Sequence, residues 1–185
     1  MSANVAVVVG SLRKGAFSRS IALALKELAA PRLSLDIVEI GDLPLYNPDL
    51  ETDTPPTAWT RFRDDVREAD AVLFVTPEYN RSIPGALKNA IDVGSRPVAQ
   101  SAWRGKPAAI VSVAPGMLGA FGANHQLRQA LVFSNMPVLQ QPEAYISKVG
   151  DLLDAEGRVT NEGTREFLTT FANAFADWIE RTTPR

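Results

Sequence analysis

The stretch 76–92, TPEYNRSIPGALKNAID, decides how the fold is interpreted. It follows the apolar run 71–75, AVLFV, which is typical of a buried strand. Pro84 favours the start of a helix after the polar loop. In open α/β folds such a loop lies at the carboxyl end of the sheet, where ligands bind. Pro77 and Pro84 restrict the backbone at both ends of the loop, which suits a rigid rim around a flat ligand.

Alternating strand and helix patterns fill the rest of the chain. Strands are predicted at 5–9, 33–40, 71–75, 108–113 and within 138–146, and helices at 18–30, 56–69, 84–93, 123–133 and 162–181. This alternation predicts an α/β fold, a three-layer sandwich with helices on both faces of a five-stranded parallel sheet. The flavodoxin-like strand order 2-1-3-4-5 is expected, with a ligand beside strands 1 and 3. Ser18 is expected to cap the first helix, and 41–56 to form a long surface loop.

The composition excludes several classes of protein. At 185 residues and 45% hydrophobic, the chain is expected to form one domain over 1–185. A formal net charge of −2 creates no field that favours nucleic acid or an anionic membrane. The absence of cysteine excludes disulfides and thiolate catalysis. The first residues run directly into a predicted strand, and no apolar run approaches the roughly 20 residues of a membrane span, so a cytoplasmic protein is expected.

A second polar loop, 10–19 (GSLRKGAFSR), lies between the first predicted strand and the first helix. A helix N-terminus presents unpaired N–H groups and a positive dipole end, so it attracts phosphate. The hydroxyls and the guanidinium of this loop would complete a cradle for a monophosphate. The loop matches neither a Walker A motif nor a GxGxxG motif, which disfavours triphosphates and dinucleotides. A polar turn that only caps a helix is the alternative interpretation.

The two loops together resemble those of the NADPH-dependent FMN reductases, the family that includes quinone and chromate reductases. The motifs stand in the expected order, and the resemblance covers nearly the whole chain. It implies an FMN-dependent oxidoreductase to which NADPH or NADH delivers hydride, and from which a quinone, chromate, an azo dye or free flavin then takes electrons in a ping-pong scheme. The flavin would carry the chemistry, and no catalytic side chain is implied. An electron-carrier flavoprotein without pyridine-nucleotide turnover is the alternative.

The resemblance also implies which residues contact FMN. Those assigned to the phosphate are Ser11, Arg13 and Ser18, with Ser20 beside them; those assigned to the ring are Pro77, Glu78, Tyr79, Asn80, Ser82 and Ile83; Ser112 and Gly116 would lie near the ring or the ribityl chain. Plainer interpretations exist for two of them: Tyr79 as a packing aromatic and Glu78 as a hydrogen-bonding residue that orients its loop. Ala16 departs from the family, which usually has serine there, so one hydroxyl contact is missing.

Arg81 and Arg96 are the predicted substrate-binding residues. Arg81 replaces the small or aromatic residue common in relatives, and would contact an NADPH phosphate or an anionic acceptor, or simply face solvent. Arg96 matches a family arginine near the pocket mouth, with an interface salt bridge as the alternative. The helix at 123–133 resembles the family's subunit contact, which implies a homodimer or homotetramer. His125 on that helix lacks the partner pattern of a catalytic triad, and as the only histidine it does not indicate a metal site.

Overall fold

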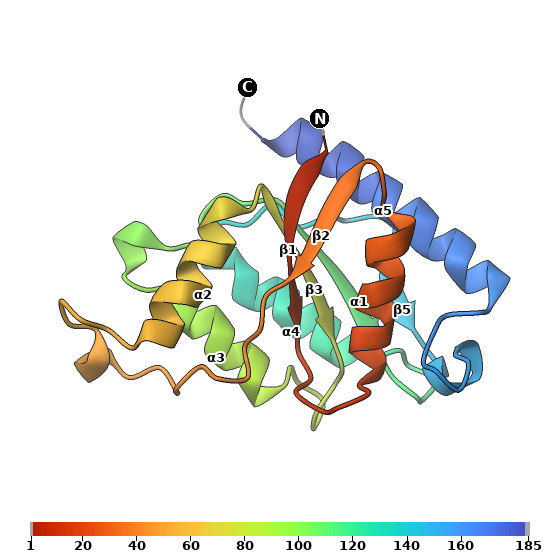
Figure 1. The fold of residues 1–185 in the computed structure, drawn as a ribbon, viewed down its shortest axis with the longest axis horizontal. Coiled ribbons are helices and arrows are strands. Elements are labelled where there is room, and N and C mark those ends of the chain that lie inside the picture. Colours follow the sequence, from red (N-terminus) through yellow and green to blue (C-terminus); the bar gives the residue numbers. More distant parts are fainter. Residues whose placement is uncertain (1, 184–185) are drawn as a thin grey trace.

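A parallel sheet forms the middle layer of the computed structural model, which describes residues 2–183 (Figure 1). Its strands are β1 (Ala3–Val9), β2 (Leu33–Ile37), β3 (Ala71–Thr76), β4 (Ala108–Val113) and β5 (Ala144–Ile146). All neighbouring strands pair in parallel, and their order is β2-β1-β3-β4-β5. This result confirms the predicted α/β fold and the predicted strand order.

Helices cover both faces of the sheet (Figure 1). Helices α1 (Phe17–Leu28) and α5 (Glu162–Thr182) pack on one face, and α2 (Thr57–Glu68), α3 (Gly85–Gly94) and α4 (Phe121–Val132) pack on the other. Residues of β1 alternate between the two cores: Val5, Val7 and Val9 face α1 and α5, whereas Ala6 and Val8 face the other three helices. Every residue of β3 is buried, which explains its continuous apolar run.

Most element boundaries lie within about two residues of the prediction, and two of the differences have a clear physical reason. Strand β2 ends at Ile37, three residues early, because Val38 and Ile40 leave the strand and pack against the α2–α4 side of the core. Helix α1 begins at Phe17, and its N-cap is Ala16 in an extended conformation without a side-chain cap. The prediction that Ser18 caps this helix was therefore wrong, since Ser18 already lies inside the first turn.

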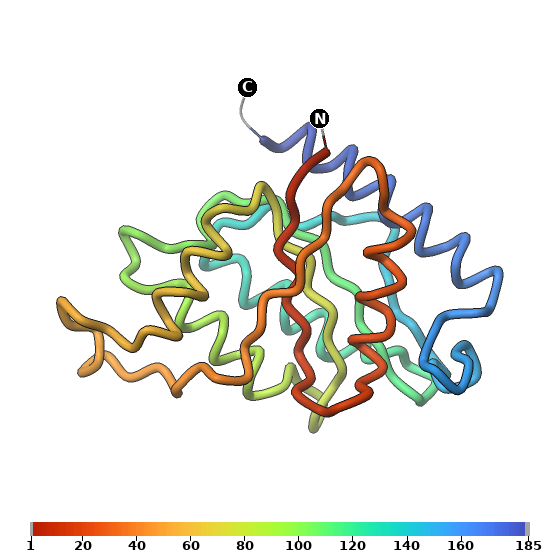
Figure 2. The backbone as a smooth tube through the Cα atoms, viewed as in Figure 1, coloured from red at the N-terminus to blue at the C-terminus, as the bar shows by residue number. Residues whose placement is uncertain are grey.

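The long segment after β2 is tied to the helices of its face. Figure 2 shows it running from the end of β2 toward α2. The side chain of Asn89 accepts a hydrogen bond from the backbone N–H of Tyr46 at 2.8 Å and donates to the carbonyl of Pro44 at 3.0 Å. The indole N–H of Trp59 donates to the same carbonyl at 3.0 Å. The segment is consequently anchored, and it contains the short 3₁₀ helix η1 (Pro48–Leu50). Within residues 2–183, no helix is both long enough and apolar enough to span a bilayer.

Candidate functional site

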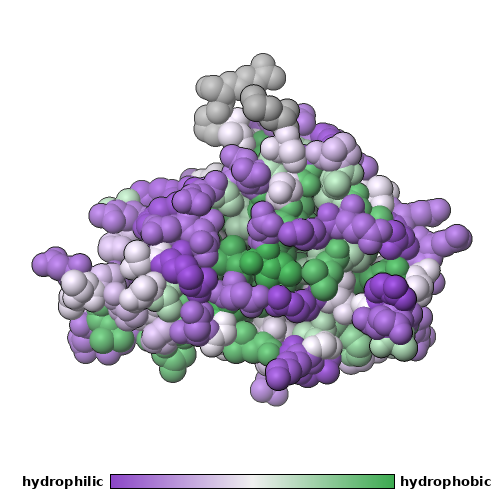
Figure 3. Space-filling model, in the orientation of Figure 1, coloured by the Kyte–Doolittle hydropathy of each residue, from purple (hydrophilic) through white to green (hydrophobic). Residues whose placement is uncertain are grey.

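The loops after β1, β3 and β4 meet at one edge of the sheet, where the strand order reverses. The loops after β1 and β3 come together at the lower edge in Figure 2, and Figure 3 shows apolar residues reaching the surface along that edge. The three loops surround a pocket of about 430 Å³. Its lining residues are Ser11, Arg13, Ala16, Phe17, Ser18, Pro77, Glu78, Tyr79, Val113, Ala114 and Pro115. A switch point of this kind is where open α/β sheets bind ligands.

The first turn of α1 faces this pocket and is prepared for an anion. Ser18 is only 2% exposed, and its hydroxyl has no hydrogen-bond partner among the described residues. A buried hydroxyl without a partner costs free energy unless a ligand atom satisfies it. The uncapped N-terminus of α1 adds backbone N–H groups and the positive end of the helix dipole. These donors suit a phosphate group.

Arg13 supplies a positive charge beside the same turn. One of its Nη atoms donates to the carbonyl of Gly15 at 2.9 Å, and its guanidinium lies 5.4 Å from the centre of the Phe17 ring. None of the ion pairs formed within residues 2–183 involves Arg13. The guanidinium is thus held in place by a carbonyl and an aromatic ring, and its charge stays available to a phosphate.

The loop after β3 folds into a tight two-residue hairpin. Tyr79 and Ser82 exchange two backbone hydrogen bonds of 2.9 Å each. The two residues between them, Asn80 and Arg81, both have positive φ, at 51° and 65°. This combination defines a type I′ turn. The hydroxyl of Tyr79 lies 3.4 Å from that of Ser11, so the hairpin also contacts the loop after β1.

Glu78 fixes the hairpin to α4. Its Oε2 accepts a hydrogen bond from the backbone N–H of Ala123 at 3.0 Å, in the first turn of that helix, and the side chain is 14% exposed. A Cβ on Gly122 would stand 3.0 Å from the same oxygen, so glycine permits this close approach. Ser82 adds a second link by donating to the side-chain oxygen of Gln126. Glu78 therefore orients the loop, in agreement with its plainer sequence interpretation.

The remaining predicted ring contacts occupy different depths. Pro77 lines the pocket, Asn80 is exposed at the tip of the hairpin, and Ile83 is half-buried against the α2–α4 core. Ser112 is fully buried and donates to the carbonyl of Gly119 at 2.8 Å, so it supports the loop after β4 from beneath. Gly116 is exposed on that loop.

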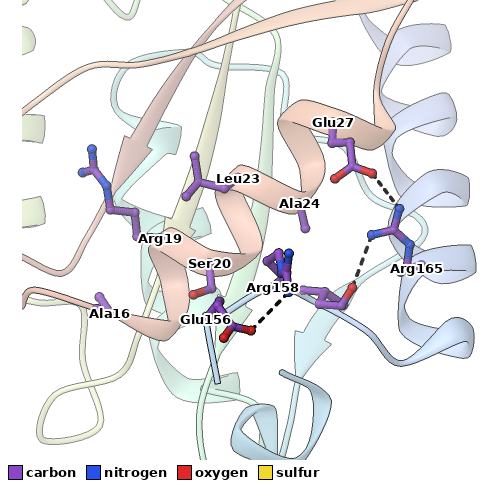
Figure 4. A pocket seen from close by; sticks show the side chains of 12 residues that line it. Ala16, Arg19, Ser20, Leu23, Ala24, Glu27, Glu156, Arg158 and Arg165 are labelled. Carbon is purple, nitrogen blue, oxygen red and sulfur yellow. Dashed lines mark hydrogen bonds and ion pairs between the residues drawn. The ribbon is translucent and has the colours of Figure 1, made fainter. Parts of the chain in front are cut away.

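Ser20 is not brought together with Ser11 and Arg13. It lines a separate pocket of about 270 Å³ between α1 and the 156–159 turn (Figure 4). The charged side chains around this hollow are already paired: Arg165 with Glu27 at 2.7 Å, and Arg158 with Glu156 at 3.1 Å. Ser20 lies two residues beyond Ser18 on α1, and this offset along the helix turns it toward the other pocket.

Arg96 also lies away from the pocket. Helix α3 begins a few residues after the hairpin, and Arg96 follows its far end, outside the residues that line the pocket. The Arg96 guanidinium stands 5.5 Å from the centre of the Phe133 ring, just beyond the end of α4. His125 is outside the pocket lining as well, and its Nε2 lies 3.0 Å from the hydroxyl of Tyr145. Burial raises the pKa of Tyr145 to about 12, and Glu143 adds to the effect.

Several lining residues were not predicted from the sequence. Phe17, Val113, Ala114 and Pro115 line the pocket alongside the predicted polar residues. Phe17 stands inside the quoted 10–19 loop, but an apolar residue at the start of a helix resembles an ordinary core position. The other three follow from the placement of β4 next to β3, because this pairing brings the end of β4 to the pocket.

Comparison with known proteins identifies the family to which the chain belongs. The family model for NADPH-dependent FMN reductases matches residues 3–151. A quinone reductase from Pseudomonas putida is 61% identical over 177 residues, which cover 96% of this chain and 95% of that protein. A 2-hydroxy-1,4-benzoquinone reductase from a Burkholderia species is 44% identical over 179 residues, 97% of each chain. Among solved structures, FerB from Paracoccus denitrificans, a flavoenzyme NAD(P)H:(acceptor) oxidoreductase, superposes with a TM-score of 0.91 at 45% identity, covering 97% of this chain and 98% of its own. The chain belongs to the NADPH-dependent FMN reductase family.

Proposed function

We propose that this protein is an FMN-dependent oxidoreductase that uses NADPH or NADH to reduce quinones. The observation that carries the proposal is the pocket in which the unpartnered Ser18 hydroxyl, the N-terminus of α1 and the Arg13 guanidinium face a rigid hairpin. Family membership supports FMN as the cofactor. The names of the Pseudomonas and Burkholderia relatives support quinones as the acceptor class.

The residues of the pocket suit FMN. Ser11, Ser18 and Arg13 would hold its phosphate together with the first N–H groups of α1. Pro77, Tyr79, Ala114 and Pro115 also line the pocket and would contact the flavin ring. When bound, FMN supplies the hydride chemistry. The protein would orient the flavin. The Glu78 carboxylate anchors the hairpin to α4 and is not assigned a proton transfer, because its Oε2 accepts a hydrogen bond from the backbone N–H of Ala123. Chromate, azo dyes and free flavin are further acceptors that an open pocket would admit.

We also propose that the protein forms a homodimer or homotetramer through α4. Large apolar side chains are exposed at both ends of this helix: Phe121 at its first position, and Val132 and the C-cap residue Phe133 at its end. Exposed apolar residues gathered on one element are typical of an interaction surface. Arg96 contacts Phe133, so we assign it to this surface in place of the pocket mouth. Light scattering should give at least twice the chain mass of 20.0 kDa. The proposed compartment is the cytoplasm, where both nicotinamide nucleotides occur.

Steady-state turnover tests the proposed activity. The purified holoenzyme is mixed with NADPH or NADH and 1,4-benzoquinone, and nucleotide oxidation is followed. Oxidation that depends on the quinone and on bound FMN is expected. An electron-carrier flavoprotein would hold FMN but show no sustained nucleotide oxidation, and that result would favour the alternative function.

A further inference from the structure

The tip of the hairpin after β3 carries a positive charge that the fold does not require. Arg81 occupies the second central position of the type I′ turn, with φ at 65°. Glycine is favoured there, because a Cβ is disfavoured in the left-handed region. The Arg81 side chain is 79% exposed, so packing offsets little of this backbone cost. An arginine at this position therefore destabilises the turn, and its side chain makes little packing contact that would compensate for this cost.

The acidic neighbour of Arg81 holds it only loosely. Its Nη1 lies 3.5 Å from Oε1 of Glu78, and the other oxygen of that carboxylate is bonded to α4. A pair of this length whose cation stands in solvent contributes little to stability. Two other exposed cations are more tightly paired: Arg19 with Glu39 at 2.8 Å, and Lys88 with Asp92 at 2.7 Å. Arg81 is thus able to turn its charge toward a ligand.

The hairpin places this charge beside the pocket. Glu78 and Tyr79 line the pocket, and the Tyr79 hydroxyl reaches the loop after β1 at Ser11. Arg81 follows Tyr79 by two residues, with the backbone of the turn fixed by paired hydrogen bonds. Simple quinones carry no charge, whereas a nicotinamide dinucleotide carries a pyrophosphate, and NADPH carries a 2′-phosphate in addition. A guanidinium is the side chain best suited to bind a phosphate through a planar fork.

We propose that Arg81 is a specificity-determining residue that binds a phosphate group of the nicotinamide co-substrate. The inference rests on the proposed function and adds a residue and a ligand group to it. It explains why an exposed arginine stands where glycine would stabilise the turn, since local strain is common at functional positions.

Arg81→Gly separates the two roles of the residue, because it removes the charge and relieves the backbone at once. Calorimetric titration of the holoenzyme with NADP⁺ and NAD⁺ measures binding without turnover. We expect NADP⁺ to bind roughly five- to tenfold more weakly, because the variant loses a charge-assisted contact. The expected loss is at the low end for such contacts because Arg81 is exposed to solvent. The melting temperature should rise by roughly 2–4 °C. A loss confined to NADP⁺ assigns the contact to the 2′-phosphate, and an equal loss for NAD⁺ assigns it to the pyrophosphate; either result supports the proposal.

Two further variants serve as controls. Arg81→Lys keeps a charge but loses the planar fork, so its NADP⁺ affinity should fall between those of the other two forms. Asn135→Gly relieves another left-handed residue, with φ at 52°, just beyond the end of α4. It should raise the melting temperature by less, because asparagine tolerates this conformation, and leave NADP⁺ affinity unchanged.

Unchanged affinity of Arg81→Gly for both nucleotides would overturn the proposal. A lower mass by light scattering with unchanged affinity would assign Arg81 to a subunit contact and overturn it as well. Failure of the proposed function would look different: the unsubstituted protein would lack FMN or would not oxidise NADPH with a quinone, and both proposals would then fall.

Discussion

The hydroxyl of Tyr79 lies 3.4 Å from the hydroxyl of Ser11, and this contact joins the loops after β3 and β1. It is long for a bond between two hydroxyls, so it is weak. The Tyr79 ring is half-exposed and lines the pocket. The hydroxyl and the ring can therefore be tested separately.

Tyr79→Phe should change FMN affinity by less than about twofold, because only the weak contact is lost. Tyr79→Ala removes the aromatic wall and should weaken FMN by roughly three- to tenfold. Quenching of FMN fluorescence during titration of the apoprotein measures both. If Phe were as harmful as Ala, the hydroxyl and not the ring would be the important group.

Arg13→Ala should weaken FMN by roughly ten- to a hundredfold, since it removes a charge-assisted contact to the phosphate. Riboflavin lacks the phosphate and should bind both forms equally. Lys14→Ala is the matched control, because it removes the neighbouring exposed charge and should leave FMN affinity nearly unchanged. Equal FMN affinity in Arg13→Ala and the unsubstituted protein would show that Arg13 does not meet the phosphate.

Glu78→Ala should destabilise the protein by about 1 kcal/mol, the usual effect of losing a side-chain acceptor at a helix N-terminus. Glu78→Gln keeps an acceptor for Ala123 and should lose less. Urea denaturation of the apoprotein measures the free energy of unfolding apart from any flavin effect. Equal stability of the Ala variant and the unsubstituted protein would contradict an anchoring role for Glu78.

Glu51→Ala should destabilise the protein by about 3 kcal/mol, because it leaves a buried guanidinium uncompensated. Arg63 is 4% exposed, and its Nη atoms lie 2.7 and 2.9 Å from the two oxygens of Glu51. Glu39→Ala breaks an exposed pair of 2.8 Å with Arg19 and should cost less than about 1 kcal/mol. Chemical denaturation of both variants makes the comparison, and similar losses would show that burial does not set the strength of these pairs.

The parts of the fold that follow from hydrophobic patterning were predictable. The run 71–75 reads as a strand because β3 is covered on both faces, and the alternating elements then determine the sheet order. The boundaries of the elements were harder to predict from the sequence, since the end of β2 depends on how Val38 and Ile40 pack into the core. The start of α1 was misplaced because serine is a common N-cap, whereas here the chain uses Ala16.

The candidate site was predictable where it depends on loop position and less so where it depends on side-chain direction. Ser11, Arg13, Ser18, Pro77, Glu78 and Tyr79 meet in one pocket, as expected for loops at a switch point. Ser20 faces another pocket because it stands two positions after Ser18 on a helix, and Arg96, beyond the end of α3, contacts Phe133 and does not line the pocket. The partner of Glu78 on α4 could not be read from the sequence, because 45 residues separate the two.

Anaerobic titration of the purified protein tests the central claim most directly. The protein is expected to be yellow and to release FMN, not FAD, on denaturation. NADPH or NADH should bleach the visible absorbance of the bound flavin, and a stoichiometric addition of 1,4-benzoquinone should restore it. A colourless protein that fails to bind added FMN, or a bound flavin that neither nucleotide bleaches, would contradict the account.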